Sequence, residues 1–140
     1  MKRILIAEDN AVNRELLREL LEARGYTVEE ACNGQEALAM IAQSKPDALL
    51  LDLNMPVLDG FATMRKIRED PAMATLPVLA VTAYAMRGDR EKTLAAGFDE
   101  YLSKPISPSA LDAELERLWQ KRRVESGNPK PLAQVGRNET

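Results

Sequence analysis

Residues 48–56 have the sequence Ala-Leu-Leu-Leu-Asp-Leu-Asn-Met-Pro, in which a continuous apolar run ends at the carboxylate of Asp52. Such a run, without alternating polar residues, is typical of a strand that is covered on both faces of a parallel sheet. A buried charge is unfavourable unless it is paired, neutralised or bound to a metal. Asp52 is therefore the first candidate for a functional residue.

A second apolar run, at residues 4–7, also ends in acids, Glu8 and Asp9. If both runs are strands of one parallel sheet, their carboxyl ends meet at the same edge, where sites of such sheets lie. Three clustered carboxylates would repel one another without a cation. Because carboxylate oxygens suit Mg²⁺, we expect a magnesium site that contains Asp52.

Five apolar strand candidates alternate with five segments of helical period. The strands are predicted at residues 3–7, 26–31, 47–52, 77–82 and 99–103. The helices are predicted at residues 11–24, 34–43, 60–69, 86–96 and 108–122. The first helix has one broad apolar stripe, made of Val12, Leu16, Leu17, Leu20 and Leu21. This alternation predicts the α/β class, a doubly wound parallel sheet with right-handed crossovers and helices on both faces.

Two further polar residues lie at or just past the ends of predicted strands, Thr82 at the end of the fourth and Lys104 after the fifth. They bring a hydroxyl and a positive charge to the same edge of the sheet as Asp52. Phosphoryl transfer requires positioning and the stabilisation of charge on the phosphoryl oxygens, which a cation, a hydroxyl and a metal can supply. Carboxylates act as nucleophiles that form aspartyl-phosphates. The pattern therefore indicates phosphoryl transfer to a carboxylate.

The composition narrows the class of protein. The chain has 140 residues, 45% of them hydrophobic, which predicts one domain with its own core. A net charge of −3 gives no basic footprint for nucleic acid. The chain has no histidine, which excludes a Ser-His-Asp mechanism, a histidine zinc site and a phosphohistidine of its own.

The ends of the chain and the single cysteine, Cys32, suggest its location. One cysteine allows no internal disulfide, and the first apolar run is too short for a signal peptide or a membrane span. We therefore expect a cytoplasmic protein with no membrane partner. Residues 123–140 are rich in glycine, proline and polar residues, which predicts a flexible C-terminal tail after a domain at 1–122.

Residues 1–122 resemble the receiver domain of two-component response regulators, of the single-domain type. Four segments carry the resemblance: Ile-Leu-Ile-Ala-Glu-Asp-Asn at 4–10, Leu-Leu-Asp-Leu-Asn-Met-Pro-Val-Leu-Asp-Gly at 50–60, Val-Thr-Ala at 81–83 and Tyr-Leu-Ser-Lys-Pro at 101–105. The resemblance implies a flavodoxin-like strand order, 2-1-3-4-5. It also implies a signalling domain that catalyses only its own phosphorylation and dephosphorylation.

The resemblance also assigns roles to the residues at the sheet edge. It implies that Asp52 accepts a phosphoryl group from a histidine kinase or a histidine phosphotransfer protein. It implies that Thr82 and Lys104 bind the phosphoryl oxygens and that the bond before Pro105 is cis. The implied Mg²⁺ ligands are Glu8, Asp9, Asp52 and the backbone carbonyl of Asn54.

The family further implies a switch, in which Thr82 moves toward the phosphoryl group and Tyr101 rotates inward. These movements would remodel the face formed by helix 86–96, the last strand and helix 108–122. We expect an unknown output protein to bind that face, and a homodimer is also compatible with it. Such a switch responds to the charge and the acceptor oxygens of the phosphate.

Three alternatives stay open at this stage. The chain could be a phosphorelay intermediate or the receiver fragment of a hybrid kinase. It could be a Mg²⁺-dependent hydrolase with an aspartyl-phosphate intermediate, although Asn54 stands where such an enzyme needs an acid–base aspartate. It could also be a degenerate receiver that serves as a binding scaffold.

Overall fold

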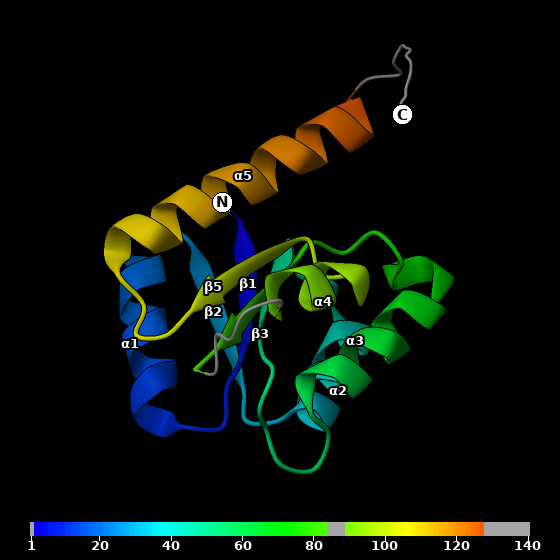
Figure 1. The fold of residues 1–140 in the computed structure, drawn as a ribbon, viewed down its shortest axis with the longest axis horizontal. Coiled ribbons are helices and arrows are strands. Elements are labelled where there is room, and N and C mark those ends of the chain that lie inside the picture. The colour runs from blue at the N-terminus through cyan, green and yellow to red at the C-terminus, as the bar shows by residue number, and fades with distance from the viewer. Residues whose placement is uncertain (1, 84–88, 128–140) are drawn as a thin grey trace.

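The structure is a computed structural model, and it describes residues 2–83 and 89–127. Five parallel strands form one sheet in the order β2-β1-β3-β4-β5 (Figure 1). The strands are β1 (Arg3–Ala7), β2 (Thr27–Ala31), β3 (Ala48–Asp52), β4 (Val78–Thr82) and β5 (Glu100–Ser103). The helices are α1 (Ala11–Glu22), α2 (Gly34–Gln43), α3 (Gly60–Glu69), α4 (Asp89–Ala95) and α5 (Pro108–Gly127), with a short 3-10 turn, η1 (Pro71–Met73). The predicted doubly wound sheet and its strand order are confirmed.

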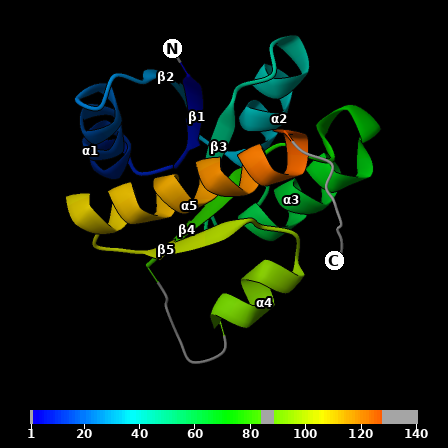
Figure 2. The same cartoon turned by 90° about the horizontal axis from the view of Figure 1, so that it is seen from above.

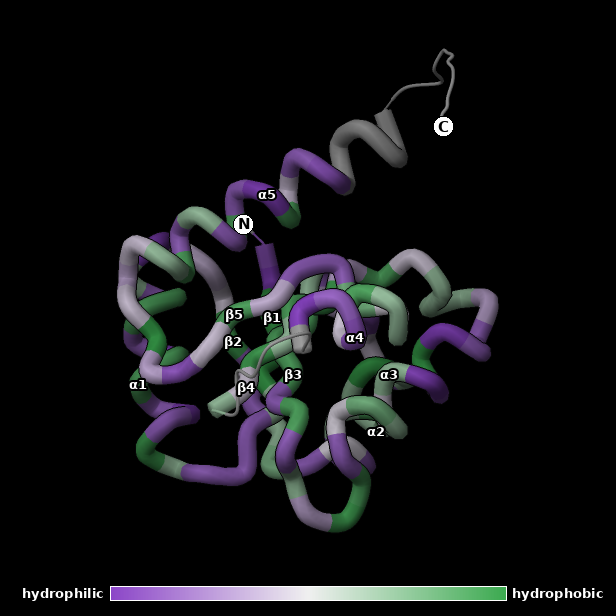
Figure 3. The backbone as a smooth tube through the Cα atoms, in the orientation of Figure 1, coloured by the Kyte–Doolittle hydropathy of each residue, from purple (hydrophilic) through white to green (hydrophobic). Residues whose placement is uncertain are grey.

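The central strands divide their side chains between two hydrophobic clusters. Leu49 and Leu51 of β3 belong to a cluster with buried residues of α2 and α3, whereas Leu50 belongs to a cluster with those of α1 and α5. This follows from the strand period of two, which directs successive side chains to opposite faces. The view in Figure 2 shows these helices around the sheet, and Figure 3 shows hydrophobic residues concentrated on the strands. Because both faces are covered, β3 is buried along its whole length.

Three asparagine or aspartate side chains cap the helices that follow the sheet edge. Asn10, Asn33 and Asp59 accept hydrogen bonds of 2.9, 2.8 and 2.8 Å from backbone N–H groups three residues later. Such caps satisfy donors that a helix leaves unpaired at its first turn. They fix where α1, α2 and α3 begin, and so they fix the lengths of the loops that surround the strand ends.

The element boundaries differ from the prediction in a few places. The first helix ends at Glu22 rather than 24, because the chain turns there toward Gly25, whose φ is +88°. The predicted start of the fourth helix, residues 86–88, lies outside the described residues. In the stripe of α1, Leu17 and Leu21 are buried, but Val12 and Leu16 are exposed.

The last helix is longer than predicted, because α5 continues to Gly127. The first five residues of the expected tail are therefore helical. Its sequence there contains good helix formers and no glycine or proline before Gly127. The rest of the expected tail, residues 128–140, lies outside the described residues. Within the described part of the chain, no helix has the length and apolarity needed to cross a membrane.

Candidate functional site

The strand register brings the predicted site residues to one edge of the sheet. β1 pairs with β3 through Ala7 and Leu51. Glu8 and Asp52 are the residues that come next after this pair. Asp52 in turn is aligned with Val81 of β4, the residue before Thr82. Lys104 donates its backbone N–H to the carbonyl of Thr82 at 2.7 Å. The carboxyl ends of four strands therefore surround one point, as parallel sheets favour.

The carboxylates of Glu8, Asp9 and Asp52 form a cluster at this point. One oxygen of each lies within 4.8 Å of the others. Glu8 and Asp52 are 1% and 4% exposed, whereas Asp9 is exposed. The cluster opens into a hollow of about 200 Å³, which is lined by these acids and by Asn10, Asn13, Asn54, Ala83 and Lys104.

Lys104 supplies the positive charge that faces the acids. Its Nζ lies 2.7 Å from Glu8 Oε1 and 3.4 Å from Asp52 Oδ2. Burial opposes the charge of this lysine, but the hydrogen bonds and charges of Glu8 and Asp52 together raise the Lys104 pKa. The acids therefore hold Lys104 firmly in its charged form.

The charge of the cluster is not balanced by Lys104 alone. Burial raises the pKa of Glu8; Lys104 opposes this shift, and the nearby Asp52 carboxyl adds to it. Two buried carboxylates and an exposed one, with a single lysine among the residues that line the hollow, leave negative charge that a cation could neutralise. Hard oxygen donors in this number fit a divalent cation of the Mg²⁺ or Ca²⁺ type.

The loop between β3 and α3 folds tightly over the end of β3. Asp52 Oδ1 accepts a hydrogen bond of 3.1 Å from the backbone N–H of Asn54, and Asn54 Nδ2 lies 3.5 Å from Thr82 Oγ1. At Gly60, an added Cβ would meet the carbonyl oxygen of Asp52 at 2.6 Å and the Cα of Leu53 at 2.7 Å. Only glycine allows this close approach.

The predicted residues Thr82 and Pro105 do not line the hollow, and Tyr101 does not line it either. Tyr101 lies on β5, where it is paired with Ala80, and its half-buried ring packs against the hydrophobic cluster of α2 and α3. The Lys104–Pro105 peptide bond is cis, as predicted. The structure thus joins Glu8, Asp9 and Asp52 with Lys104, whereas Tyr101, on the strand that precedes Lys104, packs against the hydrophobic cluster.

Comparison with known proteins decides the family. The family model for the response regulator receiver domain matches residues 4–116 of the chain. The chain belongs to the response regulator receiver domains. The predicted resemblance is therefore confirmed.

Individual relatives are similar to this receiver domain along most of their length. It is 41% identical over 106 residues to the polar-differentiation response regulator DivK of Brucella anthropi, which covers 76% of this chain and 86% of DivK. A crystal structure of a response regulator from Chloroflexus aurantiacus has a TM-score of 0.81 and 33% identity, and covers 85% of this chain and 98% of its own. A third similar structure is the receiver domain of the sensor histidine kinase PA1611 from Pseudomonas aeruginosa, which has a magnesium ion coordinated in its active site cleft. Its TM-score is 0.77 and its identity 38%, and the match covers 84% of this chain and 96% of the PA1611 chain.

One contact of the receiver domain's site could not be foreseen from the motifs. Arg14 of α1 donates a hydrogen bond of 2.8 Å to the backbone carbonyl of Glu8 and pairs with Glu30 of β2. The sequence carried a faint signal, because Glu29 and Glu30 are two acids within a predicted strand and acids in a sheet need basic partners. Which base pairs with them depends on the packing of α1 against β2.

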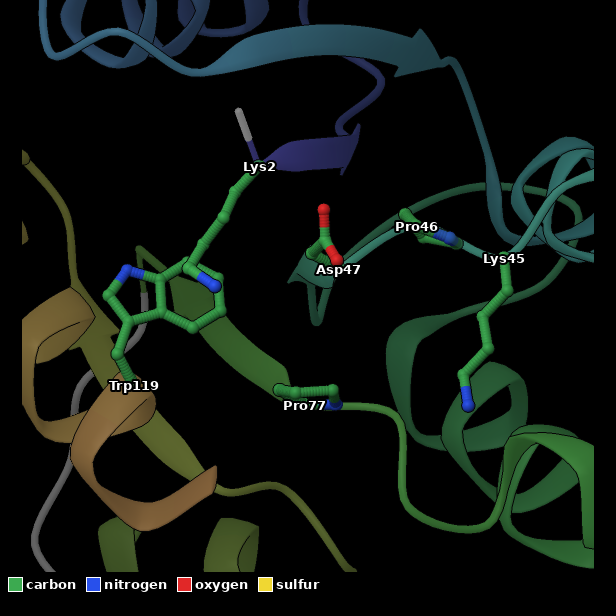
Figure 4. Close-up of a pocket in the computed structure, with 6 residues that line it drawn as sticks. All are labelled: Lys2, Lys45, Pro46, Asp47, Pro77 and Trp119. Atoms are coloured by element: carbon green, nitrogen blue, oxygen red, sulfur yellow. The ribbon is translucent and has the colours of Figure 1, made fainter. Parts of the chain in front are cut away.

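A larger hollow, of about 360 Å³, lies at the other end of the strands, next to the residues that precede β1, β3 and β4 (Figure 4). Its lining includes Lys2, Lys45, Asp47 and Trp119. The Lys2 ammonium lies 4.8 Å from the centre of the Trp119 ring, and Asp47 accepts a 2.7 Å hydrogen bond from the backbone of Arg3. Three of these groups, Lys2, Trp119 and Asp47, already have such contacts, so the smaller hollow with the acid cluster is the better candidate for the functional site.

Proposed function

We propose that Asp52 is the phosphoacceptor of this receiver domain and that its donor is a phosphohistidine on a histidine kinase or a histidine phosphotransfer protein. Response regulator receivers interact with proteins of these two classes. The observation that carries the proposal is the cluster of Glu8, Asp9 and Asp52 with Lys104 in contact. In the transfer, an oxygen of Asp52 would bond to phosphorus as the phosphorus–nitrogen bond of the donor breaks, and the imidazole would leave with its electron pair.

The proposed metal is Mg²⁺, which when bound would neutralise charge on the phosphoryl oxygens. Glu8, Asp9, Asp52 and the backbone carbonyl of Asn54 would hold it. The donor chemistry of the acid cluster supports this assignment, as does the magnesium ion in the similar PA1611 receiver. The backbone N–H of Asn54 would keep the Asp52 carboxylate oriented during the reaction.

Lys104 and Thr82 are the proposed contacts of the phosphoryl oxygens. Lys104 is already a donor to Asp52, and Thr82 ends the neighbouring strand. We assign Thr82 and Tyr101 to the switch, because they lie on the adjacent strands β4 and β5, and β5 contacts α4 and α5. The proposed output partner is a protein that binds α4, β5 and α5, and a homodimer through this face is the alternative.

Exposed apolar residues beside the acid cluster support a protein as the phosphodonor. Val12 and Leu16, one turn apart on α1, are 74% and 44% exposed. Leu16 also lines a small apolar hollow with Pro105 and Ile106, next to Lys104. Contiguous exposed apolar residues of this kind often mark protein contacts. A histidine-bearing helical protein that binds here would place its phosphoryl group over Asp52.

A second candidate function is that of a phosphorelay intermediate. It is favoured by the likeness to the PA1611 receiver, which belongs to a sensor histidine kinase. In this role, phosphorylated Asp52 would return its phosphoryl group to a histidine of a phosphotransfer protein. Transfer of label from the phosphorylated chain to such a protein distinguishes the relay from a terminal switch.

The experiment that tests the proposed function is incubation of the chain with acetyl phosphate and Mg²⁺, followed by intact-mass analysis. We expect a single phosphoryl adduct that Asp52→Ala abolishes. Asp59→Asn is the matched control, because it removes an exposed carboxylate of the same loop and keeps a residue that can cap α3. An adduct that persists in Asp52→Ala would contradict the assignment. Multiple turnover of phosphate esters would favour a hydrolase, and no adduct with no Mg²⁺ binding would favour a scaffold.

A further inference from the structure

Arg14 links three elements beside the acid cluster. Its NH1 donates a hydrogen bond of 2.8 Å to the backbone carbonyl of Glu8, and its Nε lies 3.0 Å from Glu30 Oε1. The side chain is only 17% exposed. A guanidinium has donors in a fixed planar fork, so it can hold a carbonyl and a carboxylate at once. Arg14 therefore joins α1 and β2 to the segment that connects β1 to α1.

The acid that anchors Arg14 is itself held in place. Glu30 lies on β2 and also pairs with Arg18, which forms a further ion pair with Glu22. The bond from Arg18 is the main cause that lowers the pKa of Glu30, and the bond from Arg14 adds to it against the effect of burial. Glu30 thus stays ionised and neutralises Arg14. A neutralised arginine affects the acid cluster through geometry more than through charge.

The hydrogen bond from Arg14 to Glu8 lies where the backbone hydrogen bonds of the sheet end. The N–H of Glu8 donates to the carbonyl of Ala31 on β2 at 3.1 Å, so the ladder extends as far as this residue. The carbonyl of Glu8 bonds instead to Arg14, which therefore fixes the peptide plane between Glu8 and Asp9. Among the described residues, the Asp9 carboxylate has no hydrogen-bond partner. Its position relative to Asp52 consequently depends on that peptide plane.

We propose that Arg14 is a positioning residue for the metal site, which holds the Glu8–Asp9 peptide in the orientation that presents both carboxylates to one cation beside Asp52. The inference rests on the proposed function of the acid cluster. Mg²⁺ requires near-ideal octahedral geometry, so a ligand that rotates with its peptide binds it poorly. Groups behind the ligands commonly change metal affinity by about 10- to 100-fold when they are removed.

Arg14→Gln and Arg18→Gln form a matched pair of variants. Each removes one arginine of α1 that pairs with Glu30, and each changes the net charge equally. Only Arg14 reaches the carbonyl of Glu8. The measurement is the dissociation constant of Mg²⁺ by isothermal titration calorimetry on the unphosphorylated chain, with thermal unfolding in EDTA to compare the stability of the two variants.

We expect Arg14→Gln to weaken Mg²⁺ binding by about tenfold or more and Arg18→Gln to leave it within about twofold. The rate of phosphorylation by acetyl phosphate should recover in Arg14→Gln as Mg²⁺ is raised, because the chemistry at Asp52 is intact. Arg14→Lys is a milder variant that keeps the charge but can serve only one of the two acceptors at a time, and it should show an intermediate loss.

Three outcomes would overturn the inference. The first is an unchanged Mg²⁺ affinity in Arg14→Gln, and the second is an equal loss in both glutamine variants, which would indicate a general effect of charge or stability. The third is wild-type affinity in Arg14→Lys, which would show that the two-point contact is unnecessary. If the wild-type chain itself bound no Mg²⁺, the proposed metal site would fail together with the inference.

Discussion

The ammonium of Lys104 is closer to Glu8 than to Asp52. Its Nζ lies 2.7 Å from Glu8 Oε1 but 3.4 Å from the nearest oxygen of Asp52. The shorter contact of the lysine is thus with Glu8, the proposed metal ligand that follows β1, and the contact with the proposed phosphoacceptor is longer. Repulsion among the three carboxylates is therefore only partly offset, and we expect the site to be less stable without a cation than with one.

Replacing Asp52 with asparagine should stabilise the metal-free protein. Asp52→Asn removes one of the clustered charges at nearly constant volume, and we expect a gain of about 1 kcal/mol in the free energy of unfolding. Urea denaturation in EDTA measures it. Added Mg²⁺ should reduce the difference in unfolding free energy between Asp52→Asn and the wild type. A cation that binds only the folded state would stabilise the wild type, which keeps all three carboxylates, more than the variant. Equal stabilities in EDTA would contradict the expectation of repulsion.

Gly60 should tolerate no side chain. Gly60→Ala places a Cβ against the carbonyl oxygen of Asp52 and the Cα of Leu53, both backbone atoms that cannot move aside cheaply. We expect destabilisation of about 2–3 kcal/mol and slower phosphorylation of Asp52, since the loop must shift. Gly25→Ala is the control: its φ is +88° and nothing lies near its Cβ, so it should cost only about 1 kcal/mol and leave phosphorylation unchanged.

Val57 in the loop after β3 is a strained residue that can be relieved. Its φ is +70°, a left-handed conformation that is strained for valine. Its side chain is 78% exposed, so little packing compensates for this strain. Val57→Asn should stabilise the chain by about 0.5–1 kcal/mol, because asparagine adopts this conformation more readily. Val12→Asn is the matched control, an exposed valine within α1, and should not stabilise. A lower melting temperature in Val57→Asn would refute the prediction.

Glu100 should make stability depend on pH. Burial raises its pKa above the ordinary value of 4.5, and the neighbouring carboxyl of Glu114 raises it further, while Lys121 and Arg90 oppose the shift from 3.7 and 3.6 Å. A raised folded-state pKa means that the ionised form costs stability above that pKa and that the cost disappears as pH falls toward the unfolded value.

Glu100→Gln should therefore be more stable than the wild type at neutral pH, and the two should converge as the pH falls toward 4.5. Chemical denaturation across this range measures the difference. Glu91→Gln, at an exposed position of α4, should show no such trend. A stability gap that stays constant over the whole range would indicate that packing, rather than ionisation, distinguishes the variants.

A charge on the exposed face of α1 should impair transfer from a protein donor alone. With a histidine kinase that labels the wild type, Val12→Glu should lower kcat/KM by about tenfold, equivalent to roughly 1.4 kcal/mol, because a carboxylate enters an apolar contact. Labelling by acetyl phosphate should not change. Leu94→Glu, an exposed residue of α4, is the control and should retain transfer. Equal loss with both donors would place the defect in the site instead.

The sequence predicted the sheet and the acid cluster because both depend on local patterns. The apolar runs that end at Asp52 and Glu8 define buried parallel strands, and parallel topology alone brings their ends together. The period of α1 did not reveal which of its apolar residues would be exposed, because the helix extends past the sheet and leaves Val12 outside the core. Composition also misplaced the end of α5, since residues 123–126 contain no glycine or proline and the helix continues through them to Gly127. The role of Arg14 is not visible in the sequence, because its two partners are Glu8, which follows β1, and Glu30, which lies on β2, and only the fold brings them to α1.

The contacts of Trp119 bring the first strand and the last helix to the same end of the molecule. Trp119 of α5 donates a hydrogen bond of 2.7 Å to the hydroxyl of Tyr26. Lys2 lies over the Trp119 ring (Figure 4). This end is opposite the edge that carries Asp52. A fluorescent protein or surface tether joined before Lys2 or after α5 would therefore leave the acid cluster open to a donor, and the indole itself would report on unfolding from a position remote from the chemistry.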